Sequence, residues 1–84
     1  MSRDPQPDWV LEYRRAVGDR IRDRRIQESR IQWWVCERTG LGRSTYQEIE
    51  RGETDARLSW LARIAAALNT TVDQLVDVEL RPPG

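Results

Sequence analysis

Between residues 43 and 51 the chain carries several side chains that can form hydrogen bonds with the edges of DNA bases. Arg43 can donate to O6 and N7 of guanine, Gln47 can pair with adenine, and Glu48 can accept from N4 of cytosine. Ser44 can bond to a base or to a phosphate. The same polar residues also fit an ordinary solvated helix face, so their meaning depends on the elements that position them.

The segment Gln32–Gly52 has the pattern of two short helices joined by a tight turn. Gly40-Leu41-Gly42 marks the turn, because glycine tolerates the left-handed backbone that ends a helix. Apolar or small residues recur at helical spacing on both sides of it, at Val35, Cys36, Leu41, Thr45, Tyr46 and Ile49. A small residue in the first helix, a glycine turn and a polar second helix are typical of a helix-turn-helix unit.

The start of the first of these two helices is less regular. Ser29-x-x-Gln32 fits a capping box, and Ile31 would then supply a buried contact. Trp33 and Trp34 follow, and two adjacent indoles cannot share one helix face. At least one tryptophan is therefore expected to be partly exposed.

A long helix is predicted from Asp8, as its cap, to about Gln27. Its apolar stripe repeats every four residues, with Val10 and Ile26 beside it: Trp9, Tyr13, Val17 and Ile21. Gly18 interrupts the stripe and costs about 1 kcal/mol relative to alanine. Two helices that meet near Gly18 are the alternative.

After Gly52 the pattern predicts a loop, a helix over about Leu58–Leu68 that stops at Asn69, and a last helix to about Val76. The buried stripe of the helix over Leu58–Leu68 would be Leu58, Leu61, Ile64, Ala65 and Leu68. Thr71 to Gln74 form a second capping box, which would open the last helix. Residues 1–7 are interpreted as a disordered arm and residues 77–84 as an extended tail, in which Val78 and Leu80 alternate with acidic residues.

The 84 residues fit one domain. The single cysteine, Cys36, and the lack of histidine exclude an internal disulfide and a zinc site, and a buried Cys36 is favoured over a redox switch. No paired nucleophile and base and no phosphate-binding loop are present, so neither an enzyme nor a cofactor site is expected. No signal peptide or membrane span is expected either, and we predict a cytoplasmic protein.

The formal net charge is zero, but the charge is unevenly distributed. Residues 14–51 contain ten arginines and six acidic residues, whereas acidic residues are in excess at both ends. Positive charge therefore collects around the helix-turn-helix segment. All basic residues are arginine, which suits bidentate contacts to phosphate and guanine but also follows from a GC-rich coding sequence.

The runs GDRIRDRR, GLGRSTYQEIERG and LARIAAALNTTVDQL resemble those of the phage-repressor (Cro-like, XRE-type) helix-turn-helix family. The resemblance covers about two thirds of the chain and implies an all-α, five-helix, lambda-repressor-like DNA-binding domain over residues 18–76. Residues 8–17 would then be an N-terminal helical extension. It also implies an inward ion pair between Arg25 and Glu50, which would fix the recognition helix against the first helix.

The residues expected to contact DNA are Gln32, Arg43, Ser44, Thr45, Gln47, Glu48 and Arg51. Several positions depart from the family pattern. Gly42 replaces the usual capping hydroxyl residue, and Glu53 and Asp55 stand where relatives often carry basic residues. Gln32 would lose its phosphate contact if it served as a helix cap.

The sequence thus predicts a DNA-binding transcriptional regulator that reads the major groove of double-stranded DNA as a homodimer. The alternative is an antitoxin-like or adaptor module that binds a protein partner through the same fold. Contacts with a second copy or with a partner are expected from four aromatic residues, Trp9, Tyr13, Trp33 and Trp34.

Overall fold

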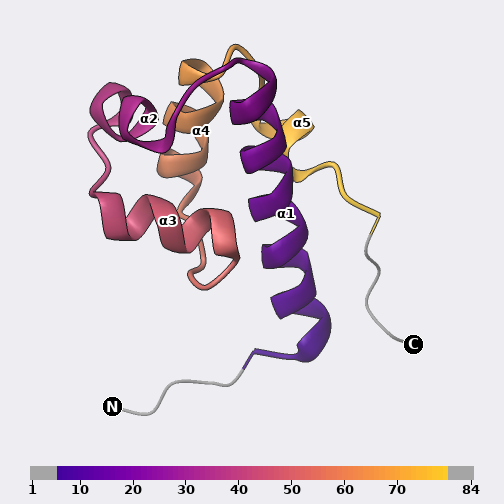
Figure 1. Ribbon diagram of the computed structural model, residues 1–84. Helices are drawn as coiled ribbons and strands as arrows, with labels where there is room; N and C mark the ends of the chain where they lie inside the picture. Colours follow the sequence, from indigo (N-terminus) through magenta and orange to yellow (C-terminus); the bar gives the residue numbers. More distant parts are fainter. Residues whose placement is uncertain (1–5, 80–84) are drawn as a thin grey trace.

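The computed structural model describes residues 6–79, which form five α-helices and no strand (Figure 1). The predicted all-α, five-helix class is confirmed. The helices are α1 (Asp8–Gln27), α2 (Gln32–Thr39), α3 (Arg43–Arg51), α4 (Leu58–Ala67) and α5 (Val72–Val76).

Helix α1 is continuous through Gly18, so the alternative of two helices meeting there is wrong. Close packing against α3 explains the glycine at position 18. A Cβ atom at position 18 would lie 2.5 Å from the carbonyl oxygens of Ile49 and Glu50. Only a residue without a side chain lets the backbones of α1 and α3 approach this closely.

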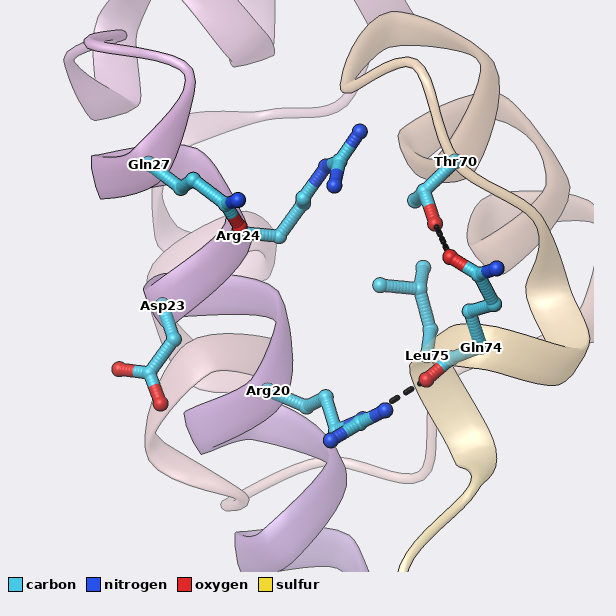
Figure 2. A pocket seen from close by; sticks show the side chains of 7 residues that line it. All are labelled: Arg20, Asp23, Arg24, Gln27, Thr70, Gln74 and Leu75. Atoms are coloured by element: carbon cyan, nitrogen blue, oxygen red, sulfur yellow. Dashed lines mark hydrogen bonds between the residues drawn. The ribbon is translucent and has the colours of Figure 1, made fainter.

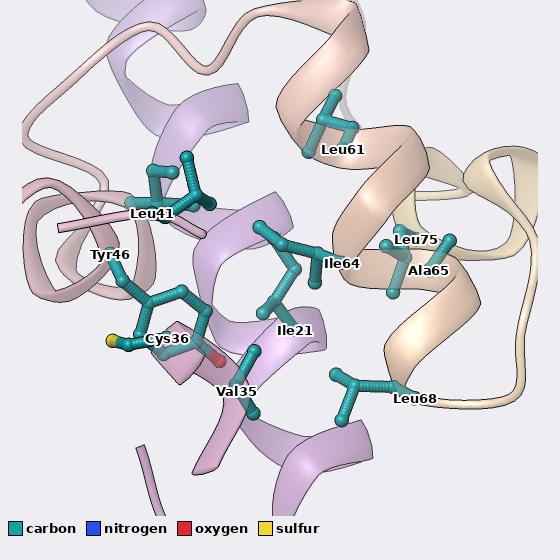
Figure 3. Close-up of a cluster of buried hydrophobic side chains, with 11 residues drawn as sticks. Ile21, Val35, Cys36, Leu41, Tyr46, Leu61, Ile64, Ala65, Leu68 and Leu75 are labelled. Carbon is teal, nitrogen blue, oxygen red and sulfur yellow. The ribbon is translucent and has the colours of Figure 1, made fainter. Parts of the chain in front are cut away.

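One hydrophobic core joins the helices, and α1 packs against α3 and α5 while α2 packs against α3 and α4. Figure 3 shows Ile21, Val35 and Ile64 directed toward one another at its centre. The remaining buried members are Cys36, Leu41, Tyr46, Ile49, Leu61, Ala65, Leu68 and Leu75. Full burial of Tyr46 and Ile49 turns the opposite face of α3 toward solvent.

A left-handed residue lies within two positions of the end of four helices, and after α1 this residue is Ser29 (φ +57°). Gly40 (φ +77°) follows α2 and Gly52 (φ +73°) follows α3, where the sequence predicts the stops. Asn69 (φ +57°) lies two residues after α4, and asparagine tolerates this conformation better than most side chains. The turn at Gly40 lies between α2 and α3 and redirects the chain from one helix to the next.

The predicted helix starts are partly wrong. Ser29 is left-handed (φ +57°), whereas a cap needs extended backbone, so the Ser29–Gln32 capping box does not form. Ile31 is instead the residue before α2 and is 66% exposed rather than buried. Leu58, the first residue of α4, is 71% exposed.

Two other capping predictions also fail. Asp8 is the first residue of α1, after Pro7, and makes no capping hydrogen bond. Thr71 precedes α5 as expected, but its side chain does not cap the helix.

Residues 1–5 and Leu80 to Gly84 lie outside the described part, which includes most of the predicted arm and tail. Residues 6–7 and 77–79 are not helical. The division into arm, extension, domain and tail stays a prediction. No described helix combines the length and hydrophobicity needed to cross a membrane.

Candidate nucleic-acid interface

The outward face of α3 carries the polar residues singled out from the sequence. Arg43 and Ser44 are exposed at its first turn, and Thr45, Gln47 and Glu48 are half-buried. Arg43 makes no hydrogen bond or ion pair with any described residue. Its guanidinium group is thus available to a ligand.

The C-terminal half of α3 is held by a buried ion pair. Arg25 Nε lies 2.7 Å from Glu50 Oε2, and Arg25 Nη2 lies 3.1 Å from Glu50 Oε1. Burial opposes ionisation of Glu50, but the hydrogen bonds from Arg25 and Gln32 lower the pKa of its carboxyl group below the usual 4.5. The pair therefore stays charged at neutral pH and links α1 to α3.

Gln32 extends this pair toward the outward face. Its Nε2 donates to Glu50 Oε1 (3.0 Å), and its Oε1 accepts from Gln47 Nε2 (3.4 Å). The order of donors and acceptors is forced, because an ionised carboxylate only accepts. Gln47 consequently keeps its own Oε1 and one N–H free, which is the donor and acceptor set that adenine N7 and N6 require.

Gln32 is thus not free in the way that the sequence suggests. It is half-buried and occupied by two side chains rather than by a helix cap. A contact from Gln32 to a phosphate stays a prediction. Its hydrogen bonds instead connect Glu50 with Gln47.

Many of the arginines form bonds within the protein. Four on α1 donate to main-chain carbonyl groups of other segments: Arg14 to Gly52, Arg20 to Gln74, Arg24 to Leu68 and Asn69, and Arg25 to Arg30. Arg51 pairs with Glu53 at 3.2 Å on the surface. Fewer arginine side chains are therefore free to contact phosphates than the local excess of positive charge suggests.

The two tryptophans of α2 have different surroundings. Trp33 is 51% exposed, whereas Trp34 packs partly against the core. The guanidinium carbons of Arg30 and Arg38 lie 3.9 and 5.2 Å from the Trp34 ring centre, within cation–π range. The expectation that two adjacent indoles occupy different faces fits this arrangement.

The remaining predicted aromatic contacts lie on α1. Trp9 is half-buried, and the Tyr13 hydroxyl donates to the carbonyl oxygen of Val76 at 3.1 Å. The Tyr13 hydroxyl group is therefore hydrogen-bonded within its own domain. A role for these residues between two copies stays a prediction.

The cavities do not indicate a catalytic or metal site. The cavity in Figure 2, of about 180 Å³ between α1 and α5, is bordered by Arg20 and Gln74, which bond to each other across it. Burial raises the pKa of the Cys36 thiol above its usual 9.0, so the thiol stays protonated.

Within residues 6–79 no group of three or more Cys, Asp and Glu side chains is placed to hold a metal ion.

Comparison with known families decides what this two-helix unit is. The family model described as "Helix-turn-helix domain" matches residues 16–78, three quarters of the chain. The chain belongs to the helix-turn-helix domain family. This confirms the resemblance to Cro-like, XRE-type proteins and identifies a DNA-binding regulator in general terms.

A solved structure supports the assignment of this helix-turn-helix protein. The restriction-modification controller protein C.AhdI from Aeromonas hydrophila superimposes with a TM-score of 0.69 and 28% sequence identity. The match covers 81% of this chain and 96% of C.AhdI. No curated protein matches the sequence.

Proposed function

We propose that this helix-turn-helix protein is a sequence-specific transcriptional regulator that places α3 in the major groove of double-stranded DNA. The unbonded Arg43 at the exposed first turn of α3 is the observation that supports this most directly. The main-chain amides of that turn lack a side-chain cap and can meet a phosphate oxygen. The similarity to C.AhdI, described as a controller protein, supports a regulatory role.

The proposed contacts follow from the chemistry of each side chain. Arg43 would bind a guanine, Gln47 an adenine and Glu48 the amino group of a cytosine. Ser44 and Thr45 would bond to bases or phosphates, and Arg51 to phosphate in exchange for its surface partner Glu53. Because few arginines are free, we expect a weak dependence of affinity on salt.

Selection of bound DNA from a random pool, repeated at two salt concentrations, tests the proposal. A site that contains guanine and adenine at a spacing that fits Arg43 and Gln47 is the expected result. Each phosphate contact contributes about −0.9 to the slope of log affinity against log salt. Recovery of no preferred sequence at either concentration would contradict base recognition by α3.

We further propose that two copies bind a pseudo-palindrome, with half-sites about 34 Å apart on one DNA face. A symmetric dimer is the commonest oligomer, and Trp9 on the extension is only half-buried. Sedimentation of the full chain and of a chain lacking residues 1–15 tests this. A full chain that remains monomeric at tens of micromolar would rule out the N-terminal dimer.

The half-exposed Trp33 favours a second candidate, binding of a protein partner. It borders an open hollow of about 320 Å³ together with Glu37 and Arg43. A partner bound there, as in an antitoxin-like or adaptor module, would share Arg43 with DNA. Substitution Trp33→Ala separates the two functions, because it should leave the selected DNA site unchanged and weaken only a protein complex.

A further inference from the structure

We propose that the helical extension Asp8–Val17 sets the position of the C-terminal half of α3, and that Arg14 is the positioning residue. Nearly all of this segment precedes residues 16–78, the part matched to the family. The inference rests on the proposed base recognition by α3. It assigns to the extension a role in sequence preference that is separate from dimer formation.

Arg14 binds the residue that ends α3. Its Nε and Nη2 donate to the carbonyl oxygen of Gly52 at 3.3 and 3.2 Å. Gly52 is the residue directly after α3 and has left-handed backbone. A bond to its carbonyl oxygen therefore holds the C-terminal end of α3. A cation is also favourable at the negative end of the helix dipole. Arg14 thus acts on α3 rather than on a ligand.

Backbone contact makes this attachment rigid. A Cβ atom at position 52 would lie 2.6 Å from the Cα atom of Arg15. One turn further along α1, Gly18 meets the carbonyl oxygens of Ile49 and Glu50. Residues three apart lie on one helix face, so α1 touches the end of α3 along a single line. Backbone atoms cannot rotate out of such a contact as side chains can.

The extension is itself held from the other side. Tyr13, beside Arg14, donates to the carbonyl oxygen of Val76 at the end of α5. The extension therefore joins the end of α5 to the end of α3. Movement of this segment would shift Gln47, Glu48 and Arg51 more than Arg43, because the first turn of α3 lies furthest from the attachment.

Small displacements matter at such a site. Groups that recognise a ligand have to be held within about 0.5 Å and 10–20° of the productive geometry. Loss of the Arg14 bond should therefore weaken discrimination at the bases contacted by Gln47 and Glu48. Discrimination at the base contacted by Arg43 should persist.

The test compares full-length Arg14→Gln and Arg14→Lys with Arg22→Gln, a matched loss of charge on α1. Arg22 is exposed, and among residues 6–79 its one ion pair is with the exposed Asp19, at 3.9 Å. We expect Arg14→Gln to lower the ratio of specific to random affinity by roughly fivefold, the size of one hydrogen bond. Arg14→Lys, which keeps the positive charge and a single donor nitrogen, should retain part of the ratio, and Arg22→Gln should retain it fully.

Hydrogen exchange gives a readout that does not require DNA. The amides of Gly52 and Glu53 donate to Ile49 and Glu48 at the end of α3, and they should exchange faster in Arg14→Gln. Unchanged exchange and unchanged base preference in a folded Arg14→Gln would overturn the inference. If Arg14→Gln does not fold, Arg14→Lys with wild-type preference and exchange would overturn it.

The two proposals fail in different ways. A wild-type chain without any preferred sequence refutes base recognition, whatever Arg14 does. A wild-type chain with a clear site, and an Arg14→Gln variant with the same site and the same ratio, refutes only the positioning role.

Discussion

The two ends of α3 are built differently, although the helix has only nine residues. At the C-terminal end, Glu50 is paired with Arg25, and Gly52 is bonded to Arg14 and lies against the α1 backbone. At the N-terminal end, Gly42 offers no side-chain cap and a Cβ atom there would meet nothing within 4 Å. Arg43 beside it is exposed and unbonded.

The difference indicates that the C-terminal end of α3 is positioned by the fold, whereas the N-terminal end is available to a ligand. The fold determines where the C-terminal end lies, before any ligand arrives. The N-terminal end keeps its amides and its arginine unsatisfied, and a bound phosphate or base would order them. Gln47 combines features of both ends. One N–H of its amide is bonded to Gln32, and the other N–H and the amide oxygen remain free.

Disruption of the fixed end should have the largest effect. Removal of one partner of a buried ion pair costs about 3–5 kcal/mol, because the other charge is left unmatched. Arg25→Ala and Glu50→Ala should each lower the free energy of unfolding by this order, and the folded fraction should keep its preference at the base contacted by Arg43. A double-mutant cycle in urea measures the coupling. A coupling of zero would mean that the pair does not hold α3.

The same end should respond to pH. The pKa of Glu50 is lowered in the folded state, so its contribution to stability is present above 4.5 and is lost as the pH falls through the folded value. Burial raises the pKa of Tyr46 far above 10.0, so stability should also fall as the pH rises beyond 10.0. Urea unfolding across pH, with Glu50→Gln as control, should show a shallower acid limb in the variant. Acid limbs of equal slope would exclude Glu50 as the titrating group.

Substitutions on the open face should affect recognition and leave folding intact. Arg43→Ala and Gln47→Ala should each cost roughly 1–3 kcal/mol of discrimination between the selected site and random DNA. Binding titrations on both DNAs give this ratio. Wild-type ratios in both variants would show that α3 is not the recognition helix.

Capping the free end should have the smallest effect. Gly42 already has the extended backbone of a cap (φ −67°, ψ 153°) and has room for a side chain. Gly42→Ser should therefore stabilise the fold by only a few tenths of a kcal/mol, and by about 1 kcal/mol relative to alanine at this position. Thermal unfolding measures the gain, and Gly42→Ala, which cannot cap, is the control. Equal melting temperatures in the serine and alanine variants would show that no cap forms.

The fold was largely predictable from the sequence, because local signals carry it. Helical spacing of apolar residues and the stops at Gly40, Gly52 and Asn69 predict all five helices to within about two residues. The errors at Ser29 and Ile31 arise where two signals compete. A serine followed by glutamine resembles a cap, but the tight α1–α2 turn needs a left-handed residue at position 29.

The candidate site was predictable in its residue types but not in its supporting contacts. Resemblance to a family suggested the Arg25–Glu50 pair, and the polar face of α3 followed from periodicity. The bond from Arg14 to Gly52 joins residues 38 apart and depends on how two helices cross. No local pattern encodes such a contact. Gly18, an unfavourable residue inside a helix, was the one available hint of close backbone approach.

The bond between Tyr13 and Val76 has a consequence for how the chain matures. The two residues are 63 apart, so during translation α1 receives this partner only after α5 has emerged from the ribosome. Arg20 likewise waits for the carbonyl oxygen of Gln74. At about 5–20 residues per second, translation leaves α1 without these contacts for several seconds. The nascent chain therefore completes its fold only after α5 has been synthesised.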